Sequence, residues 1–167
     1  MRYKRLKNIY KLFCLLIAFF FAATGVFALE VDKEDYAVIC GRKIFLKIAD
    51  TKEERMEGLM YIKHLPEYQG MIFLFPQAEP RNFWMKNVEI PLDMIFIRKR
   101  KIMSIQKNVP VFTKYIYKSV YSADCIIEVN AGFCDKYNIK AGDFIYLSDG
   151  VKYKWEQVKS AAASEND

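Results

Sequence analysis

The sequence predicts a mainly antiparallel β protein, either a compact β barrel or a jelly-roll-like sandwich, with two short helices. Many apolar segments have the length of strands, and turn residues separate them. Only two segments carry helix signals, and no regular long helices alternate with the strands, so a βαβ fold is not expected. The chain has 167 residues, of which 53% are hydrophobic and 16% aromatic. This is enough for one domain with a packed core that needs no disulfide.

The N-terminus has the pattern of an export signal. Five basic residues and no acid precede an apolar run over 12–23, and Val26-Phe27-Ala28 has small residues at the positions that a signal peptidase inspects. We therefore predict that residues 1–28 form a signal peptide and that the protein is exported, to the periplasm or beyond. The alternative is an uncleaved anchor, since the mainly apolar stretch that begins at Leu12 and continues beyond Ala23 has about 18 residues and approaches the length of a spanning helix. The membrane would then be contacted only through this leader.

The charge of the mature part excludes a broad nucleic-acid footprint. The whole chain has 26 basic and 20 acidic residues, a net charge of +6. Without the five basic residues of the leader, 21 basic residues stand against 20 acidic ones, so the mature part is near +1. The one basic run, Arg98-Lys99-Arg100-Lys101, lies between two strand-like segments and is typical of a solvated hairpin turn. We expect no nucleic-acid partner.

The domain, residues 29–157, is expected to begin with a β hairpin and a helix. The hairpin joins Tyr36–Cys40 to Lys43–Ala49 through a turn at Gly41-Arg42. Asp50-Thr51 then offers an N-cap with acidic residues in the first turn, so we expect a helix that ends near Tyr61. This helix has three apolar residues at core spacing: Met56, Leu59 and Met60.

The middle of the chain consists mainly of strand-like segments. Met71–Phe75 is apolar on both faces, which is typical of a buried strand, and Pro76 stops it. A long connection is expected over 109–120. Four further strands are expected at Arg81–Val88, Leu92–Ile97, Ile102–Asn108 and Tyr121–Val129.

The C-terminal part is expected to finish the sheet. Asn130 is placed to cap a short helix over Ala131–Tyr137. A strand follows at Phe144–Leu147, and Tyr153–Gln157 is expected as a closing strand. The small, polar residues at the end predict a disordered tail over 158–167.

Several short motifs also carry a family resemblance, and the most specific block runs from Trp84-Met85-Lys86-Asn87 to Asp93. The chain resembles the DUF192 family, also called UPF0127, over roughly residues 44–147. The resemblance implies a compact β barrel or jelly-roll-like fold and implies no activity. The connection after Asn108 departs from the family pattern, because residues 115–118 replace prolines and small residues. Further matching motifs are Glu54-Arg55 with Gly58-Leu59-Met60, Gly70-Met71 with Phe73 and Phe75, Ile90-Pro91-Leu92-Asp93-Met94 with Phe96-Ile97, Ser104-Ile105, Glu128-Val129 with Ala131-Gly132, and Ala141-Gly142-Asp143.

Asp93 is the polar residue that most needs a partner. It shares a strand face with Ile95 and Ile97, and a carboxylate in such a setting must be paired or hydrogen-bonded. One interpretation is a buried ion pair with Lys86, Arg55 or Arg81. Another is a carboxylate that accepts backbone N–H groups at the Pro91 turn, and a third is a ligand-binding or catalytic group.

The leading functional hypothesis is a binding protein for a small or extended polar ligand, such as an envelope polymer. The ligand would lie in a cleft around the block from Trp84 to Asp93. An indole face can stack on a sugar ring or a cation, although Trp84 could equally be a core residue. Asp93 would hold one of the cations in place. The candidate ligand-binding residues are Arg81, Trp84, Lys86, Asn87 and Asp93.

Two other function classes remain open. One is a hydrolase of cell-envelope polymers, with Asp93 as acid or base and Glu89 or Glu128 as a second carboxylate, since glycosidases need two facing carboxylates. The sequence shows no second acid in an apolar setting like that of Asp93, and no catalytic residue is assigned. The other class is a structural or interaction module that uses a sheet edge.

We expect neither a metal nor a cofactor. His64 is the single histidine, which excludes a histidine-based metal set and argues against a Ser-His-Asp triad. The methionines stand at core spacing, which favours packing over copper binding. The mature part has three cysteines, which allow at most one internal disulfide.

Overall fold

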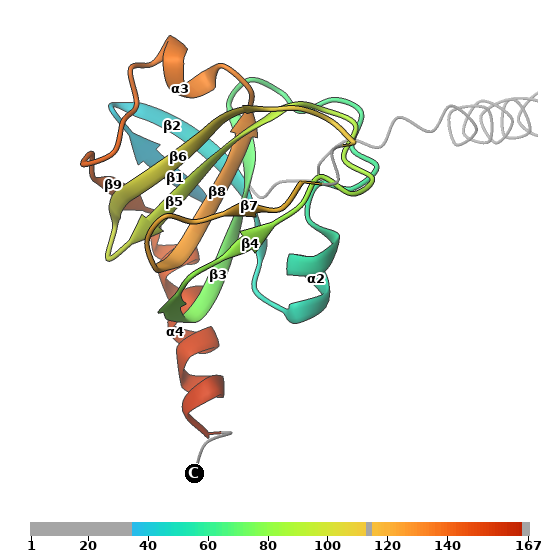
Figure 1. The fold of residues 1–167 in the computed structure, drawn as a ribbon. Helices are drawn as coiled ribbons and strands as arrows, with labels where there is room; N and C mark the ends of the chain where they lie inside the picture. The colour runs from blue at the N-terminus through green and yellow to red at the C-terminus, as the bar shows by residue number, and fades with distance from the viewer. Residues whose placement is uncertain (1–34, 113–114, 165–167) are drawn as a thin grey trace, which may run out of the picture.

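The computed structural model describes residues 35–112 and 115–164 and shows a strongly curled sheet (Figure 1). Its seven strands follow the order β6-β5-β8-β3-β2-β1-β9. The β2–β3 pair is parallel, and all the other pairs of neighbours are antiparallel. The predicted mainly β, barrel-like fold is confirmed. The strands of this sheet are β1 Tyr36–Ile39, β2 Arg42–Ala49, β3 Gln69–Glu79, β5 Leu92–Arg98, β6 Lys101–Val109, β8 Ala123–Asn130 and β9 Ile145–Leu147.

The two edge strands of the curled sheet meet at one end. An antiparallel bridge joins Lys101, at the start of β6, to Phe144, just before β9. Beside it, the Ile102 N–H donates to the Asp143 carbonyl at 2.8 Å, and the Gly142 N–H donates to the Ile102 carbonyl at 2.8 Å. These bonds use backbone groups that a sheet edge would otherwise leave unpaired.

Both faces of the central strands are buried, which explains their continuous apolar sequences. In β3, Ile72 and Leu74 enter one core, while Met71 and Phe73 enter another. The first core contains Val151 and Trp155 of helix α4 (Asp149–Ser164) and Phe133 and Cys134 of helix α3 (Phe133–Lys136). The second core lies under helix α2 (Lys52–Glu57) and the segment 83–90. Alternate residues of β3, β5 and β8 therefore face different layers.

Helix α2 begins where the sequence predicts and ends earlier. Thr51 and Glu54 form a capping box, each side chain accepting the other's backbone N–H. The helix ends at Glu57 because Gly58 takes φ of 54°, a left-handed conformation that glycine adopts at no steric cost. Met56 was expected in the core, and this is wrong: its side chain is 55% exposed.

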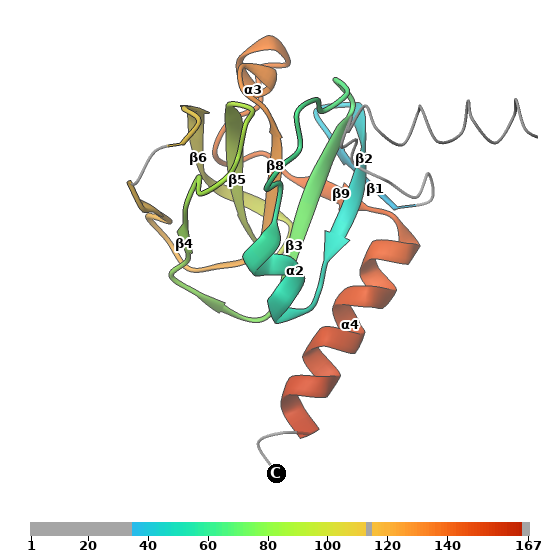
Figure 2. The ribbon, with the colours of Figure 1, turned by 90° about the vertical axis from the view of Figure 1, so that its right-hand side faces the viewer.

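The C-terminal segment is a helix, so the predicted closing strand at Tyr153–Gln157 is wrong. Helix α4 also includes residues 158–164 of the expected disordered tail. Val151 and Trp155, four residues apart, lie on its buried face, and the Trp155 indole donates to the Phe75 carbonyl at 3.0 Å. Figures 1 and 2 show α4 at the end of the barrel opposite α3, with its last turns beyond the strands.

The predicted strand Arg81–Val88 is mostly irregular. Only Asn82–Phe83 form a strand, β4, which pairs with β7 (Tyr117–Lys118) in the long connection. The chain then turns at Asn87, whose φ of 56° is left-handed. Residues 84–88 therefore do not alternate between two faces as the residues of a strand would.

Two further expectations are also corrected. Asn130 does not cap α3: its side-chain amide donates to the Leu65 carbonyl at 2.8 Å, and Gly132 occupies the N-cap. The three cysteines of the described part are free, with Cys40 exposed and Cys125 and Cys134 buried. Among the described helices, none is long and apolar enough to cross a membrane. The predicted signal peptide lies outside the described residues.

Candidate functional site

Three adjoining pockets form a groove that is lined by residues of α2 and of β4 and the segment after it. These two elements lie at the end of the barrel opposite α3 (Figure 2). All three are lined by Arg55, Met56, Phe83 and Trp84. The two outer pockets have volumes of about 260 and 300 Å³, and the inner one of about 20 Å³ is room for one water molecule. We call this surface the Trp84 groove.

The walls of the Trp84 groove are apolar and come from three elements. Helix α2 contributes Met56, and the pairing of β4 with β7 holds Phe83 in place through its register with Tyr117. Trp84 follows directly and is 46% exposed, so it is not the core residue that one interpretation expected. Ile116 adds exposed apolar surface from the connection after β6. Exposed aromatic and aliphatic side chains gathered in a hollow are typical of a ligand site.

Two arginines flank Phe75 behind the outer groove. The guanidinium carbon of Arg81 lies 3.8 Å from the Phe75 ring centre, and that of Arg55 lies 5.1 Å from it. Arg55 Nη1 donates to the carbonyls of Asp50 at 2.6 Å and Leu74 at 3.0 Å. Arg81 donates to the carbonyls of Gln77 and Ala123 and pairs with Glu79 at 3.4 Å. Both side chains are therefore held in fixed positions.

These arginines retain their charge although burial lowers the pKa of each. An arginine pKa lies far above neutrality, so a moderate lowering leaves the guanidinium ionised. Lys52 lines one outer pocket, and Lys86 lines the inner one with its Nζ 5.4 Å from the Trp84 ring centre. The lining thus contains four cationic side chains and two acidic residues, Glu57 and Glu128.

Glu128 lies at the inner end of the groove and is only 4% exposed. It is on β8, where its neighbours in the sheet are Met71 of β3 and Met94 of β5. Its carboxyl has no hydrogen bond or ion pair within the described part of the chain, and burial raises its pKa to about 8. At neutral pH the group is therefore mainly a neutral carboxylic acid. The interpretation that no second acid has an apolar setting like that of Asp93 is wrong.

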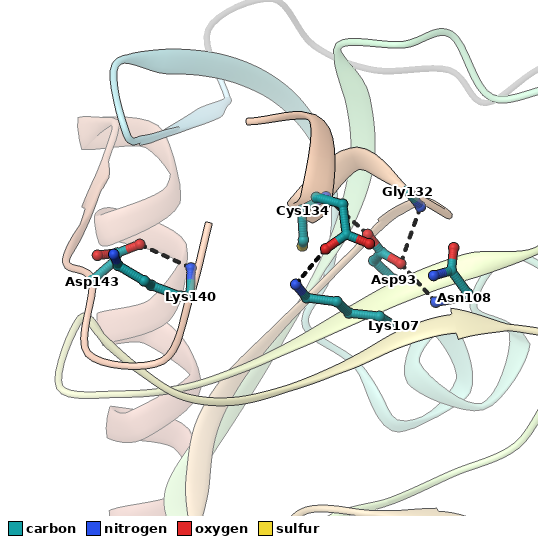
Figure 3. A network of polar contacts seen from close by, with 8 residues as sticks. Asp93, Lys107, Asn108, Gly132, Cys134, Lys140 and Asp143 are labelled. Atoms are coloured by element: carbon teal, nitrogen blue, oxygen red, sulfur yellow. Dashed lines mark hydrogen bonds and ion pairs between the residues drawn. The ribbon is translucent and has the colours of Figure 1, made fainter. Parts of the chain in front are cut away.

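Asp93 is buried on the other face of the sheet, away from the Trp84 groove. Figure 3 shows its contacts with Asn108, Gly132 and Cys134. Its Oδ1 accepts the backbone N–H groups of Asn108 at 2.8 Å and Gly132 at 3.2 Å, and its Oδ2 accepts that of Cys134 at 2.9 Å. The expected ion pair with Lys86, Arg55 or Arg81 is wrong. The carboxylate does accept backbone N–H groups, but at the end of β6 and the start of α3 instead of at the Pro91 turn.

Asn87 does not line the groove. Its side-chain amide donates to the Tyr61 hydroxyl at 2.7 Å, and its carbonyl accepts the Tyr61 N–H at 2.8 Å. These bonds tie the loop after α2 to the segment after β4. Asn87 therefore supports the shape of the groove from outside.

The two-carboxylate arrangement of a hydrolase does not form. Asp93 pairs in register with Val129, and Glu128 pairs with Met94, so the two acids point to opposite faces of the sheet. Glu89 is exposed in the turn before β5. Of the five candidate residues, the structure brings together Arg81, Trp84 and Lys86.

The other groove residues have only weak signals in the sequence. The sequence indicates Arg55 only as a possible partner for Asp93, and Phe83 and Met56 are apolar residues of the kind that fill a core. Glu128 had a usable signal, because it interrupts the apolar run Cys125-Ile126-Ile127 before Val129. A lone acid in a strand that is otherwise apolar on both faces predicts a buried carboxyl.

A second cleft of about 500 Å³ lies between the β5–β6 turn and α4. Its lining includes both signs of charge, and two of its lysines are paired: Lys152 with Asp149 at 3.0 Å, and Lys159 with Glu156 at 2.9 Å. Lys99 contributes its backbone N–H to Asp124. This cleft has fewer exposed apolar groups than the Trp84 groove, and its Asp124 is bonded through Oδ2 while its buried Oδ1 has no partner among the described residues.

Comparisons with known proteins identify related domains. The family model DUF192, described as "Uncharacterized ACR", matches residues 37–147. The structure is similar to a crystal structure of a proposed transcription regulator from Sinorhizobium meliloti 1021, with a TM-score of 0.66 and 28% identity over 71% of this chain and 96% of that one. It is also similar to a protein of unknown function from Novosphingobium aromaticivorans DSM 12444, with a TM-score of 0.63 and 30% identity over 67% of this chain and 81% of that one. The search of curated proteins found no match.

Proposed function

The chain belongs to the DUF192 family, and from its own groove we propose that it is an exported binding protein for a ligand that joins a ring-shaped or apolar body to an anionic group. The ligand would be a small molecule or part of an envelope polymer. The observation that carries the proposal is the combination of exposed Trp84 and Met56 with four cationic side chains around one hollow. Asp93 and Glu128, the pair considered for a hydrolase, lie on opposite faces of the sheet and do not act together at this site.

The apolar walls favour a body with a flat or apolar face. Trp84 and Phe83 offer aromatic surface, and an indole can stack on a sugar or aromatic ring. The outer pockets, of about 260 and 300 Å³, are at the lower end of the range for small-molecule sites. A single ring, or one unit of a longer polymer, fits this volume.

The cations favour an anionic group on the same ligand. Lys52 and Lys86 have no ion pair with another described residue, and each lines a different pocket that also includes Trp84. A concave site with one dominant sign of charge attracts ligands of the other sign. The S. meliloti relative is described as a regulator, but the near-neutral charge of the mature chain does not favour a nucleic-acid ligand here.

The test is a set of binding measurements with matched probes. Benzoate and glucuronate carry a ring and a carboxylate, and benzyl alcohol and glucose are their neutral counterparts. We expect saturable binding of at least one anion at pH 6.5, at least tenfold tighter than its neutral counterpart, with amide NMR shifts concentrated at Arg55, Met56, Phe83 and Trp84.

Comparing variants inside and outside the groove tests whether the ligand binds there. Trp84→Ala and Lys86→Ala are expected to weaken binding, whereas Tyr153→Ala, an exposed aromatic on α4 outside the groove, is expected to leave it unchanged. No saturable binding of either anion, or shifts that map away from the groove, would contradict the proposal.

A further inference from the structure

We propose that the Glu128 carboxyl, in its protonated form, is the inner anchor of the Trp84 groove and donates a hydrogen bond to a carboxylate or phosphate oxygen of the ligand. This inference rests on the proposed function and names the chemical group that reaches deepest into the site.

The geometry places this carboxyl where a ligand atom can reach it. Glu128 lines the inner pocket together with Gly58, Phe83 and Trp84, so the same side chains that form the outer groove lead inwards to it. The inner pocket has room for one water-sized group. A single carboxylate or phosphate oxygen, with its ring still between Trp84 and Met56, matches that size.

Glu128 also has hydrogen-bonding capacity that the described part of the protein does not use. Buried polar groups in folded proteins are almost always hydrogen-bonded, and each exception calls for an explanation. No residue of the described chain bonds this carboxyl, although it is nine-tenths buried and opens on a pocket. A ligand that supplies the missing partner explains why the acid is kept there.

The protonation state decides which partner fits. Burial raises the Glu128 pKa to about 8, so near pH 7 the carboxyl carries its proton. A carboxylic acid has one O–H donor, whereas an ionised carboxylate or phosphate oxygen only accepts. The bond between them is charge-assisted and is stronger than a bond between neutral groups.

The charged groups that face Glu128 favour the same ligand class. Helix α2 contributes Arg55 and Glu57, the segment after β4 contributes Lys86, and the sheet neighbours Met71 and Met94 carry no charge. Two cations against one ionised acid leave the inner pocket positive while Glu128 is neutral. Burial raises the pKa of Glu128 to about 8, so the charge of this group changes between pH 7 and 9.

The experiment measures the affinity of benzoate and glucuronate as a function of pH. Both probes stay ionised from pH 6.5 to 9. With a pKa of about 8, the protonated fraction of Glu128 falls from roughly nine-tenths at pH 7 to one-tenth at pH 9. Because the apparent Kd scales inversely with the competent fraction, we expect binding to wild-type protein to weaken about tenfold over this interval.

Glu128→Gln is the matched variant. The carboxamide keeps the size and an N–H donor and does not titrate, so we expect binding with a flat pH profile. Amide NMR spectra of the variant check that the fold is retained. A wild-type profile that is flat, or a Glu128→Gln profile that falls like the wild type, overturns the role of Glu128 and leaves the proposed function standing.

A second readout follows the proton itself. Carbon NMR of the Glu128 carboxyl gives its pKa with and without the probe, and we expect an anion that accepts its proton to raise the pKa further. A lowered pKa, with affinity for the anionic probe rising towards pH 9, would overturn the inference. Absence of binding at every pH overturns both this inference and the proposed function.

Discussion

At the residue scale, two buried carboxyl groups on opposite faces of one sheet differ in how their burial is compensated. Asp93 accepts three backbone N–H groups, from Asn108, Gly132 and Cys134. Glu128 accepts none from the described chain and remains protonated instead. A carboxyl that loses water either finds donors or stays neutral. The hydrogen bonds of Asp93 hold the end of β6 and the start of α3 together. The protonated carboxyl of Glu128 stays available for a partner outside the described chain.

Asp93→Asn tests the structural role of the first carboxyl. The amide keeps one oxygen acceptor, but its NH₂ group faces a backbone N–H, so a buried donor is left unsatisfied. We expect the free energy of unfolding to fall by about 2–3 kcal/mol. Urea denaturation measures it. The matched control is Asp135→Asn, an exposed partner of Lys107 nearby, which should change stability little. Unchanged stability in Asp93→Asn would contradict the structural role.

Glu128→Gln tests the cost of burying the second carboxyl. The native pKa is about 8, above the usual value of 4.5. Between these pH values the native state holds a proton that the unfolded state lacks, so wild-type stability falls as pH rises. The variant has no titrating carboxyl at this position, so its free energy of unfolding does not fall for this reason as pH rises. We expect equal stability of the two proteins near pH 4 and an advantage of roughly 3–5 kcal/mol for Glu128→Gln above pH 8.

Chemical denaturation of both proteins at pH 4, 6, 7 and 9 measures this difference. Comparing the two at each pH cancels the contributions of all other titrating groups. A difference that does not change with pH would show that Glu128 is already ionised in the native state.

The sequence predicted that Asp93 needs a partner but could not identify it. Its three donors lie 15, 39 and 41 residues away along the chain, and they belong to a strand end and a helix start that only the barrel brings together. Lys86 seemed close because seven residues separate it from Asp93, but the turn at Asn87 places it on the other side of the sheet. Residues that are close along the chain can lie on opposite sides of a sheet when a turn with a left-handed residue separates them.

At the element scale, the central strands were predictable and the C-terminal helix was not. β3, β5 and β8 are apolar on both faces, and both faces are buried, so composition alone locates them. In α4 the run Tyr153-Lys154-Trp155-Glu156 alternates apolar and polar residues, as a half-buried strand does. The helical spacing of Val151 and Trp155 was the competing signal, and burial against β3 favours it.

Truncation tests which part of α4 supports the barrel. Both of its buried residues, Val151 and Trp155, lie in its first half. We expect a chain ending at Lys159 to keep a melting temperature within a few degrees of the full chain. A chain ending at Ser148 loses both buried side chains, and we expect it to lose about 3–5 kcal/mol or more. Thermal melts followed by circular dichroism compare the two. Similar melts for both truncations would show that α4 is not needed for the barrel.

At the scale of the whole molecule, the meeting of β6 and β9 bears on the interaction-module hypothesis. Both edge strands of the large sheet use backbone groups in the bridge at Lys101 and Phe144. A partner strand would have to displace these bonds or add beyond them. The groove, with its exposed aromatic and cationic groups, is the better-equipped surface for recognition.

The leader gives a prediction for the complete chain. We expect signal peptidase to remove residues 1–28, because small residues end the apolar run at Val26-Phe27-Ala28. Mass spectrometry of protein from the native envelope fraction should find an N-terminus at Leu29. A full-length species held in the membrane would instead support the uncleaved anchor.

The pairing of the first and last strands has a consequence for the timing of folding. β1 lies against β9, and the Tyr36 N–H donates to the Ser148 hydroxyl, 112 residues further along the chain. While the ribosome has not yet released residues 145–155, β1 lacks its outer neighbour, and Ala37 and Ile39 lack the covering provided by Leu147 and Val151. Contacts at such separation form late and slowly. The barrel can therefore be completed only after residues 145–155 have emerged from the ribosome, and the earlier strands remain an incomplete sheet until then.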